Sequence, residues 1–129
     1  MAHRLIPVPK VERTRLAGLA RQPGYRTSTF SKPRPCQWDP VNTHSEGGYS
    51  YSDAGAWALI ADCLNSELPI YTTDLDKPPG AWAYVFFLPP TKTWRGVYMK
   101  FEVTAPGLYG RSFHHPEHPT LDVEIDGAI

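Results

Sequence analysis

The run Val97–Thr104 constrains the fold more than any other part of the sequence, because its side chains alternate without exception between apolar and polar. Successive side chains of a β-strand point to opposite faces of the sheet. The apolar set is Val97, Met99, Phe101 and Val103, and the polar set is Tyr98, Lys100, Glu102 and Thr104. The run therefore predicts a strand with one buried face and one solvent-facing face, which is typical of an antiparallel sheet.

Three further strands and one helix are predicted around this strand. The expected strands are Ile70–Leu75, Trp82–Leu88 and Leu108–His114, with turns at Pro78-Pro79-Gly80 and Pro106-Gly107. Within Ser52–Asn65, apolar residues recur at the i, i+3, i+4, i+7 spacing of one helix face. These residues are Trp57, Ile60, Ala61 and Leu64. We therefore expect the α+β class, with one main helix packed on a small antiparallel β-sheet.

The beginning of the chain differs from the rest in composition and charge. Six of the 14 prolines lie in the first forty residues, and residues 1–35 carry eight Lys or Arg and one Glu. Residues 36–129 carry five Lys or Arg and twelve Asp or Glu, so a net charge of +7 precedes a net charge of −7. We predict a basic, proline-rich arm at 1–47, with one short helix near Val11–Ala20, and a compact domain at 48–129. The arm either is a solvated tail, meets a polyanion or lies on the acidic body.

Cysteine usage and missing motifs narrow the functional classes. The chain has Cys63 inside the apolar helix pattern, Cys36 in the arm, no secretory signal pattern and no apolar run as long as a membrane span. We therefore expect a core position for Cys63 and a cytoplasmic protein with reduced thiols. The absence of phosphate-loop, GxSxG, CxxC and dinucleotide-binding motifs makes nucleotide-driven and redox enzymes poor candidates. We expect Trp57 and Trp82 in the core, and Trp38 and Trp94 in exposed loops.

The polar faces of two neighbouring strands provide the candidate site. A tight turn pairs strand Val97–Thr104 with strand Leu108–His114, which brings their side chains within contact range. Strict alternation places Arg111 on the same face as the apolar Phe113. A β-bulge at Gly110 is therefore needed for Arg111 to join the polar face.

These residue types can cleave an RNA phosphodiester bond without a metal or a cofactor. A lysine or a glutamate can take the proton of the attacking 2′-hydroxyl, and an arginine can stabilise the charge that builds on phosphorus. A tyrosine, a histidine or a lysine can then protonate the leaving oxygen. We predict catalytic roles for Tyr98, Lys100, Glu102, Arg111, Ser112 and His114, and RNA contacts by His115, Lys77 and Arg95.

Two alternative interpretations of these residues stay open. Lys100, Glu102 and Arg111 can form cross-strand ion pairs on a solvated face with no catalytic role. The run HHPEH at 114–118 holds metal-ligand residue types, although its spacing matches no established ligand pattern. A metal site there would use His114, His115 and His118.

Residues 50–115 resemble a family of bacterial toxins. The resemblance lies in the helix with Trp57, the KPPG turn at 77–80, the VYMKFEV strand at 97–103 and the GRSFH strand at 110–114. These segments are similar to RelE-like toxins, and most of all to the MqsR family of type II toxin–antitoxin modules. The resemblance implies a helix-plus-antiparallel-sheet ribonuclease fold that cuts mRNA without a metal, with a catalytic role for Tyr98 and Lys100. Where the family has a basic residue after its Ser-Phe pair, His114 follows Ser112 and Phe113 here.

Two hypotheses about function follow. The first is a metal-independent endoribonuclease toxin that cleaves mRNA by attack of a 2′-hydroxyl and is neutralised by a cognate antitoxin protein. The alternative is a non-catalytic protein-binding module, such as an inhibitor or an accessory protein of a mobile element. The division of charge between arm and body and the exposed aromatic residues suggest this alternative. Neither hypothesis calls for a cofactor or a membrane.

Overall fold

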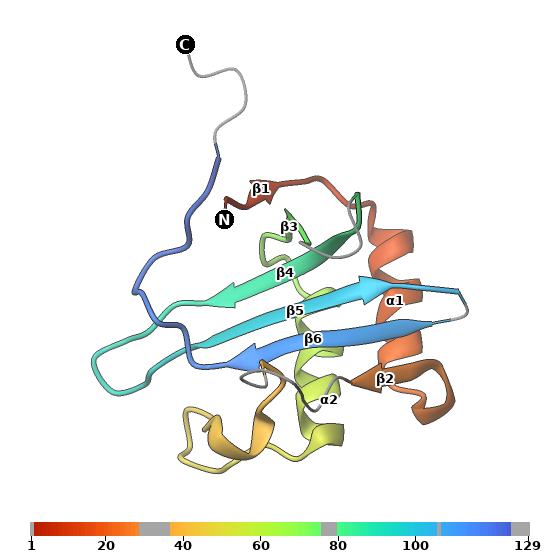
Figure 1. The fold of residues 1–129 in the computed structure, drawn as a ribbon. Helices are drawn as coiled ribbons and strands as arrows, with labels where there is room; N and C mark the ends of the chain where they lie inside the picture. Colours follow the sequence, from red (N-terminus) through yellow and green to blue (C-terminus); the bar gives the residue numbers. More distant parts are fainter. Residues whose placement is uncertain (1, 29–36, 76–79, 106, 125–129) are drawn as a thin grey trace.

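A computed structural model describes residues 2–28, 37–75, 80–105 and 107–124, and in this part of the chain two α-helices and a six-stranded sheet form an α+β fold (Figure 1). The strands are β1 (Arg4–Leu5), β2 (Arg26–Ser28), β3 (Tyr71–Asp74), β4 (Trp82–Leu88), β5 (Val97–Val103) and β6 (Leu108–His114). Their order across the sheet is β1-β3-β4-β5-β6-β2. The α+β class predicted from the sequence is confirmed.

The four central strands form an antiparallel meander. Neighbouring strands from β3 to β6 pair antiparallel, and each lies within its predicted range. Both edge strands come from the first 28 residues: β1 pairs antiparallel with β3, and β2 pairs parallel with β6. The parallel pair at β2 is the one departure from the antiparallel sheet that we expected among the described strands.

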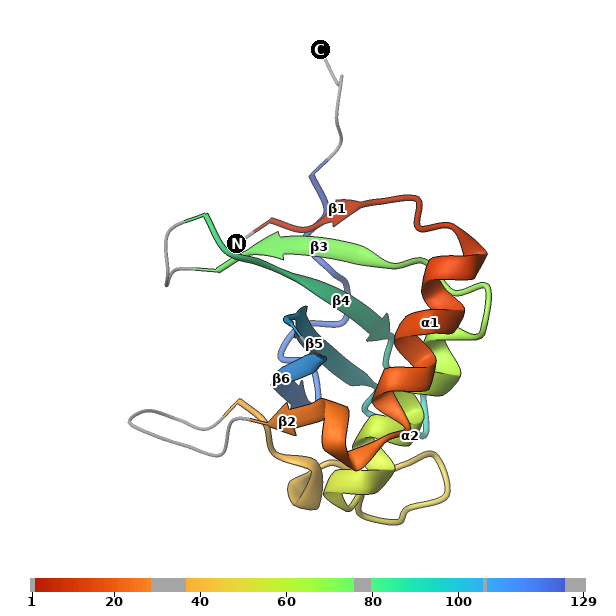
Figure 2. The ribbon, with the colours of Figure 1, turned by 90° about the vertical axis from the view of Figure 1, so that its right-hand side faces the viewer.

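Two helices of similar length cover one face of the sheet (Figure 2). Helix α2 (Asp53–Leu64) occupies the predicted range, and the Ser52 hydroxyl caps it by accepting a hydrogen bond of 2.9 Å from the Gly55 N–H. Helix α1 (Lys10–Ala20) lies where the helix near Val11–Ala20 was expected, and with 11 residues it is nearly as long as α2. Of two short 3₁₀ helices, η1 (Pro23–Tyr25) directly precedes β2, and η2 (Pro40–Asn42) lies between β2 and α2 in the sequence.

Arg13 fastens α1 to the end of α2. Its guanidinium donates hydrogen bonds to the carbonyl oxygens of Cys63 at 2.8 Å and Leu64 at 2.9 Å. Carbonyl groups in the last turn of a helix have no partner within the helix, so this side chain supplies one. The Cys63 thiol is buried as predicted, and burial raises its pKa to about 12. The other cysteine, Cys36, lies outside the described residues.

The core lies between the helices and the sheet and is rich in aromatic rings. Trp57 is fully buried, as expected. Trp38, which was expected in an exposed loop, is only 1% exposed because its indole N–H donates a 2.8 Å hydrogen bond to Asp53 at the start of α2. Trp82, expected in the core, is 46% exposed because it begins β4 at the end of the sheet. Trp94 is half-buried.

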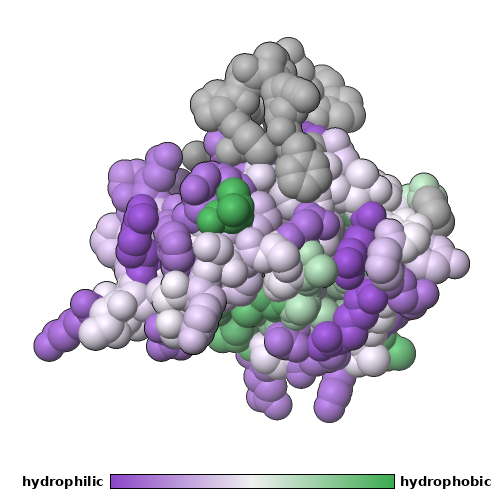
Figure 3. All heavy atoms as spheres, turned by 90° about the horizontal axis from the view of Figure 1, so that it is seen from below, coloured by the Kyte–Doolittle hydropathy of each residue, from purple (hydrophilic) through white to green (hydrophobic). Residues whose placement is uncertain are grey.

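The described residues of the predicted arm are built into the fold. They supply β1, α1 and β2, which lie at the two edges of the sheet and in the helical layer. No helix among the described residues is long and apolar enough to cross a membrane. Seen from below, hydrophilic side chains cover most of the described surface, and hydrophobic side chains form only small areas (Figure 3).

Candidate functional site

The face of the sheet that the helices leave uncovered carries the polar side chains of β5, as the alternation predicts. In β5 the apolar side chains of Val97, Met99 and Phe101 are buried toward the helices, and Val103 at the end of the strand is 38% exposed. Tyr98, Lys100 and Glu102 are partly exposed on the other side. We call this second side the open face.

A β-bulge in β6 brings Arg111 to the open face. Lys100 of β5 pairs with Ser112, but the next residue, Phe101, pairs with Gly110. Arg111 is therefore the extra residue of β6 and does not follow the alternation of the strand. The bulge predicted at Gly110 is found one residue later.

Arg111 and Glu102 form an ion pair on this face. The Arg111 Nε lies 3.3 Å from a Glu102 carboxylate oxygen, and the guanidinium lies 5.4 Å from the centre of the Tyr109 ring. The pair is the cross-strand contact that the non-catalytic interpretation expects for these two residues. Neither residue lines the hollow that holds Tyr98 and Lys100.

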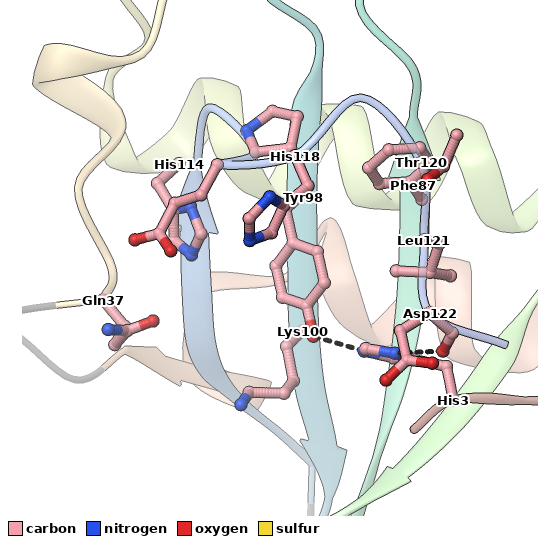
Figure 4. Close-up of a pocket in the computed structure, with 12 residues that line it drawn as sticks. His3, Gln37, Phe87, Tyr98, Lys100, His114, His118, Thr120, Leu121 and Asp122 are labelled. Carbon is pink, nitrogen blue, oxygen red and sulfur yellow. Dashed lines mark hydrogen bonds between the residues drawn. The ribbon is translucent and has the colours of Figure 1, made fainter. Parts of the chain in front are cut away.

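The open face holds a hollow of ≈ 540 Å³ at the end of β5 where Tyr98 lies (Figure 4). Tyr98 and Lys100 point into it from β5, and His114 does so from β6. The remaining lining residues are His3, Gln37, Phe87, Pro116, Glu117, His118, Thr120, Leu121 and Asp122. Three of the predicted catalytic residues thus share one cavity, and His3 from the N-terminal segment joins them.

Tyr98 and His3 form the most defined polar contact in the hollow. The Tyr98 hydroxyl lies 2.8 Å from Nε2 of His3, and Nδ1 of His3 lies 3.0 Å from the Asp122 carbonyl oxygen. A carbonyl oxygen only accepts hydrogen bonds, so in neutral His3 the proton is on Nδ1. Nε2 is then the acceptor, and the Tyr98 hydroxyl donates to it.

Burial affects the protonation of both partners. It raises the pKa of Tyr98 to about 12, because the phenolate would be poorly solvated. It also lowers the pKa of His3, although the hydrogen bond to Asp122 and the nearby Asp122 carboxylate act in the opposite direction. Tyr98 therefore stays protonated and His3 stays neutral near pH 7, which is the state that their hydrogen bond requires.

His114 and Lys100 complete the group. The His114 ring stacks on the Tyr98 ring with centroids 5.3 Å apart, and its Nδ1 donates to the His115 carbonyl oxygen at 2.9 Å. This contact directs Nε2 of His114 away from the backbone. Lys100 lies two residues after Tyr98 on the same face and brings a cation to the hollow.

The neighbouring His115 has a structural position. Its Nδ1 donates to the Gly96 carbonyl oxygen at 2.6 Å, and its Nε2 accepts from the His44 N–H at 3.1 Å. Both ring nitrogens are engaged with the backbone, so His115 does not point into the hollow beside His114. In the part of the chain that the structure describes, no three His, Cys, Asp or Glu side chains are arranged to hold a metal ion.

The other predicted site residues lie apart from the hollow. Ser112 is fully buried, and its Oγ has no hydrogen-bond partner among the described residues. Arg95 is exposed in the loop between β4 and β5. Lys77 lies outside the described residues.

His3 is the residue that the sequence did not point to. No local pattern marks it, because its position depends on the pairing of β1 with β3 and on its contact with Asp122. None of the protein-family models, curated proteins or solved structures with which the chain was compared matches it.

Proposed function

We propose that this protein is a metal-independent endoribonuclease, the toxin of a toxin–antitoxin pair, with its active site in the hollow on the open face. The observation that carries the proposal is the convergence of His3, Tyr98, Lys100 and His114 in one cavity. Together they supply a proton acceptor, a proton relay, a cation and a proton donor. These are the groups that RNA cleavage by an internal nucleophile needs.

The Tyr98–His3 pair is suited to activate the attacking hydroxyl. The RNA 2′-hydroxyl gives its proton to the Tyr98 oxygen, while the Tyr98 proton moves to Nε2 of His3. The 2′-oxygen forms a bond to phosphorus at the same time. In the resting state the Asp122 carbonyl accepts a hydrogen bond from Nδ1 of His3, which leaves Nε2 as the nitrogen that takes the Tyr98 proton.

Lys100 and His114 serve the second half of the reaction. The Lys100 ammonium neutralises the negative charge that develops on the phosphoryl oxygens. As the bond between phosphorus and the 5′-oxygen breaks, protonated His114 gives its Nε2 proton to that oxygen. The products are a 2′,3′-cyclic phosphate and a 5′-hydroxyl end.

The test is to incubate the purified protein with single-stranded RNA in excess chelator and to identify the product ends by mass spectrometry. We expect 2′,3′-cyclic phosphate ends, and no cleavage of DNA of the same sequence, because DNA lacks the 2′-hydroxyl. Tyr98→Phe should slow cleavage by about 10²-fold or more, since it removes the relayed proton. Tyr49→Phe is the matched control, because Tyr49 is 78% exposed and lies outside the hollow.

Cell growth provides the test of the toxin role. Induced expression of the wild type should arrest growth with degraded mRNA, and Tyr98→Phe should relieve the arrest at equal protein level. A folded wild-type protein that leaves RNA intact and growth unchanged would overturn the proposal. The non-catalytic protein-binding module would then be the better description.

A further inference from the structure

The segment that follows β6 runs past the neighbouring strands toward β1 (Figure 1), and its residues line one side of the hollow (Figure 4). We call residues 116–124 the strap. Half of the residues that line the hollow belong to it, among them Glu117, Leu121 and Asp122. The strap thus forms one side of the cavity, and a ligand must pass it or displace it.

The far end of the strap is attached to His3 and Arg4. The His3 N–H donates to the Asp122 carbonyl at 2.7 Å, and the Glu124 N–H donates to the His3 carbonyl at 2.6 Å. The His3 ring adds its bond to Asp122, and Arg4 forms an ion pair of 3.2 Å with Glu124. Both side chains of that ion pair are about half exposed, so solvent screens it.

The packing of the strap is also light. Residues 117–120 and 122–124 are exposed, and only Pro116 and Leu121 are half-buried. Segments with few buried apolar contacts and exposed backbone hydrogen bonds open at low free-energy cost. Among the described residues the strap therefore combines a defined closed position with few buried contacts that would oppose its release.

The charge of the strap matches that of a phosphate ligand. It carries Glu117, Asp122 and Glu124 and no Lys or Arg. It lines the same hollow as Lys100 and His3. In the closed position Glu117 and Asp122 line the hollow into which an incoming phosphate would have to be placed, and their carboxylates repel that phosphate.

We propose that the strap is an acidic gate, which closes the hollow by its attachment to His3 and Arg4 and must detach at Glu124 before an anionic ligand binds. The gate regulates the same site as the proposed ribonuclease and rests on that function only for the identity of the ligand. Because the anion-binding step can be followed without RNA, inorganic phosphate serves as the probe.

The experiment titrates inorganic phosphate into the full chain and follows the ring protons of His3 and His114 by NMR. Glu124→Ala removes the ion pair with Arg4 and keeps the backbone. We expect it to bind phosphate about 2- to 5-fold more tightly than the wild type, the range that an exposed ion pair supports. The His3 amide proton should also exchange faster with solvent, because its bond to Asp122 opens more often.

Glu67→Ala is the matched control, since Glu67 is exposed, carries the same charge and lines grooves beside the helices instead. It should leave phosphate affinity unchanged. Equal or weaker phosphate binding by Glu124→Ala, or an equal gain by Glu67→Ala, would overturn the gate, as would a wild type and a variant that bind no phosphate at all. If Glu124→Ala binds phosphate more tightly but the protein does not cleave RNA, the proposed ribonuclease function is wrong and the proposed gate stands. If the protein cleaves RNA but Glu124→Ala does not bind phosphate more tightly, the gate is wrong and the ribonuclease function stands.

Discussion

The Tyr98 hydroxyl lies 2.8 Å from Nε2 of His3, although 95 positions separate the two residues in the chain. The contact joins the central strand β5 to the segment that leads into β1 at the edge of the sheet. It converts an isolated phenol into a hydrogen-bonded pair with a defined direction of proton transfer. The N-terminal residues thus belong to the candidate site as much as to the fold.

Removal of either partner should have the same consequence. We expect His3→Ala and Tyr98→Phe each to lower the rate of RNA cleavage by about 10²-fold or more. The double variant should lose little beyond the larger single effect, because residues that act as one unit are not additive. His44→Ala is the control, since His44 is exposed and lies outside the hollow. Losses that multiply in the double variant would show that the two residues act independently.

The lowered pKa of His3 predicts how stability depends on pH. Burial favours neutral His3, so the unfolded chain binds this proton more readily than the folded chain. The contribution of His3 to stability is therefore complete above its ordinary pKa of 6.5 and is lost as the pH falls through the lower pKa of the folded state. Urea unfolding of the wild type and of His3→Gln between pH 5 and 8 measures this contribution. The wild type should lose stability relative to the variant on acidification.

The same shift should appear in the cleavage rate. His3 accepts the relayed proton only while it is neutral, so the acidic limb of the rate profile should have its midpoint below pH 6.5. Initial rates on a single-stranded RNA across pH 4.5 to 8 locate that midpoint. A midpoint above 6.5 would assign the limb to another group and would remove His3 from the mechanism.

Short-range patterns were sufficient to place the central elements. Helix α2 combines one apolar face with Ser52 as its cap, and β5 combines strict alternation with the turn signal Pro106-Gly107 after its end. These features depend on neighbours in the sequence, so the sequence predicts the elements within one residue at each end. The polar group of Tyr98 and Lys100 on the open face follows from the same alternation.

The other features of the fold and the site depend on contacts between residues far apart in the chain, and the sequence did not predict them. Strands β1 and β2 have two and three residues, which is too short for alternation to mark them. They exist because β3 and β6 offer unpaired edges. Trp38 is buried because Asp53 accepts its N–H, and His3 reaches the hollow because β1 pairs with β3. None of these partners is near in the chain.

Ser112 was predicted to be catalytic but does not line the hollow. Its Oγ is buried and has no hydrogen-bond partner among the described residues, so the hydroxyl lost its water on folding without compensation. Ser112→Ala should raise the free energy of unfolding by about 1 kcal/mol and leave RNA cleavage unchanged. Ser66→Ala is the contrast, because the Ser66 hydroxyl donates to Cys63 and accepts from Leu68. That variant should lose about 1 kcal/mol in the same urea titration.

Gly110 tests how closely Trp38 packs on β6. A Cβ at position 110 would lie 2.5 Å from Cζ3 of the Trp38 indole, well inside normal contact distance. Trp38 is wedged between β6 and α2, since its N–H is bonded to Asp53, so the indole cannot move away without breaking that bond. Gly110→Ala should therefore lower the free energy of unfolding by about 1–3 kcal/mol, the usual cost of overpacking a core.

Gly18→Ala adds the same methyl group but should raise the free energy of unfolding instead of lowering it. Gly18 lies inside α1, and a Cβ added there would meet no other atom within 4 Å among the described residues. Alanine should stabilise the helix at this position by about 0.5–1 kcal/mol, because glycine loses more backbone entropy on folding. Urea unfolding of both variants measures the two changes in the free energy of unfolding, which should have opposite signs. If Gly110→Ala proves as stable as the wild type, the indole of Trp38 does not lie against β6, and the burial of Trp38 must be explained by another contact.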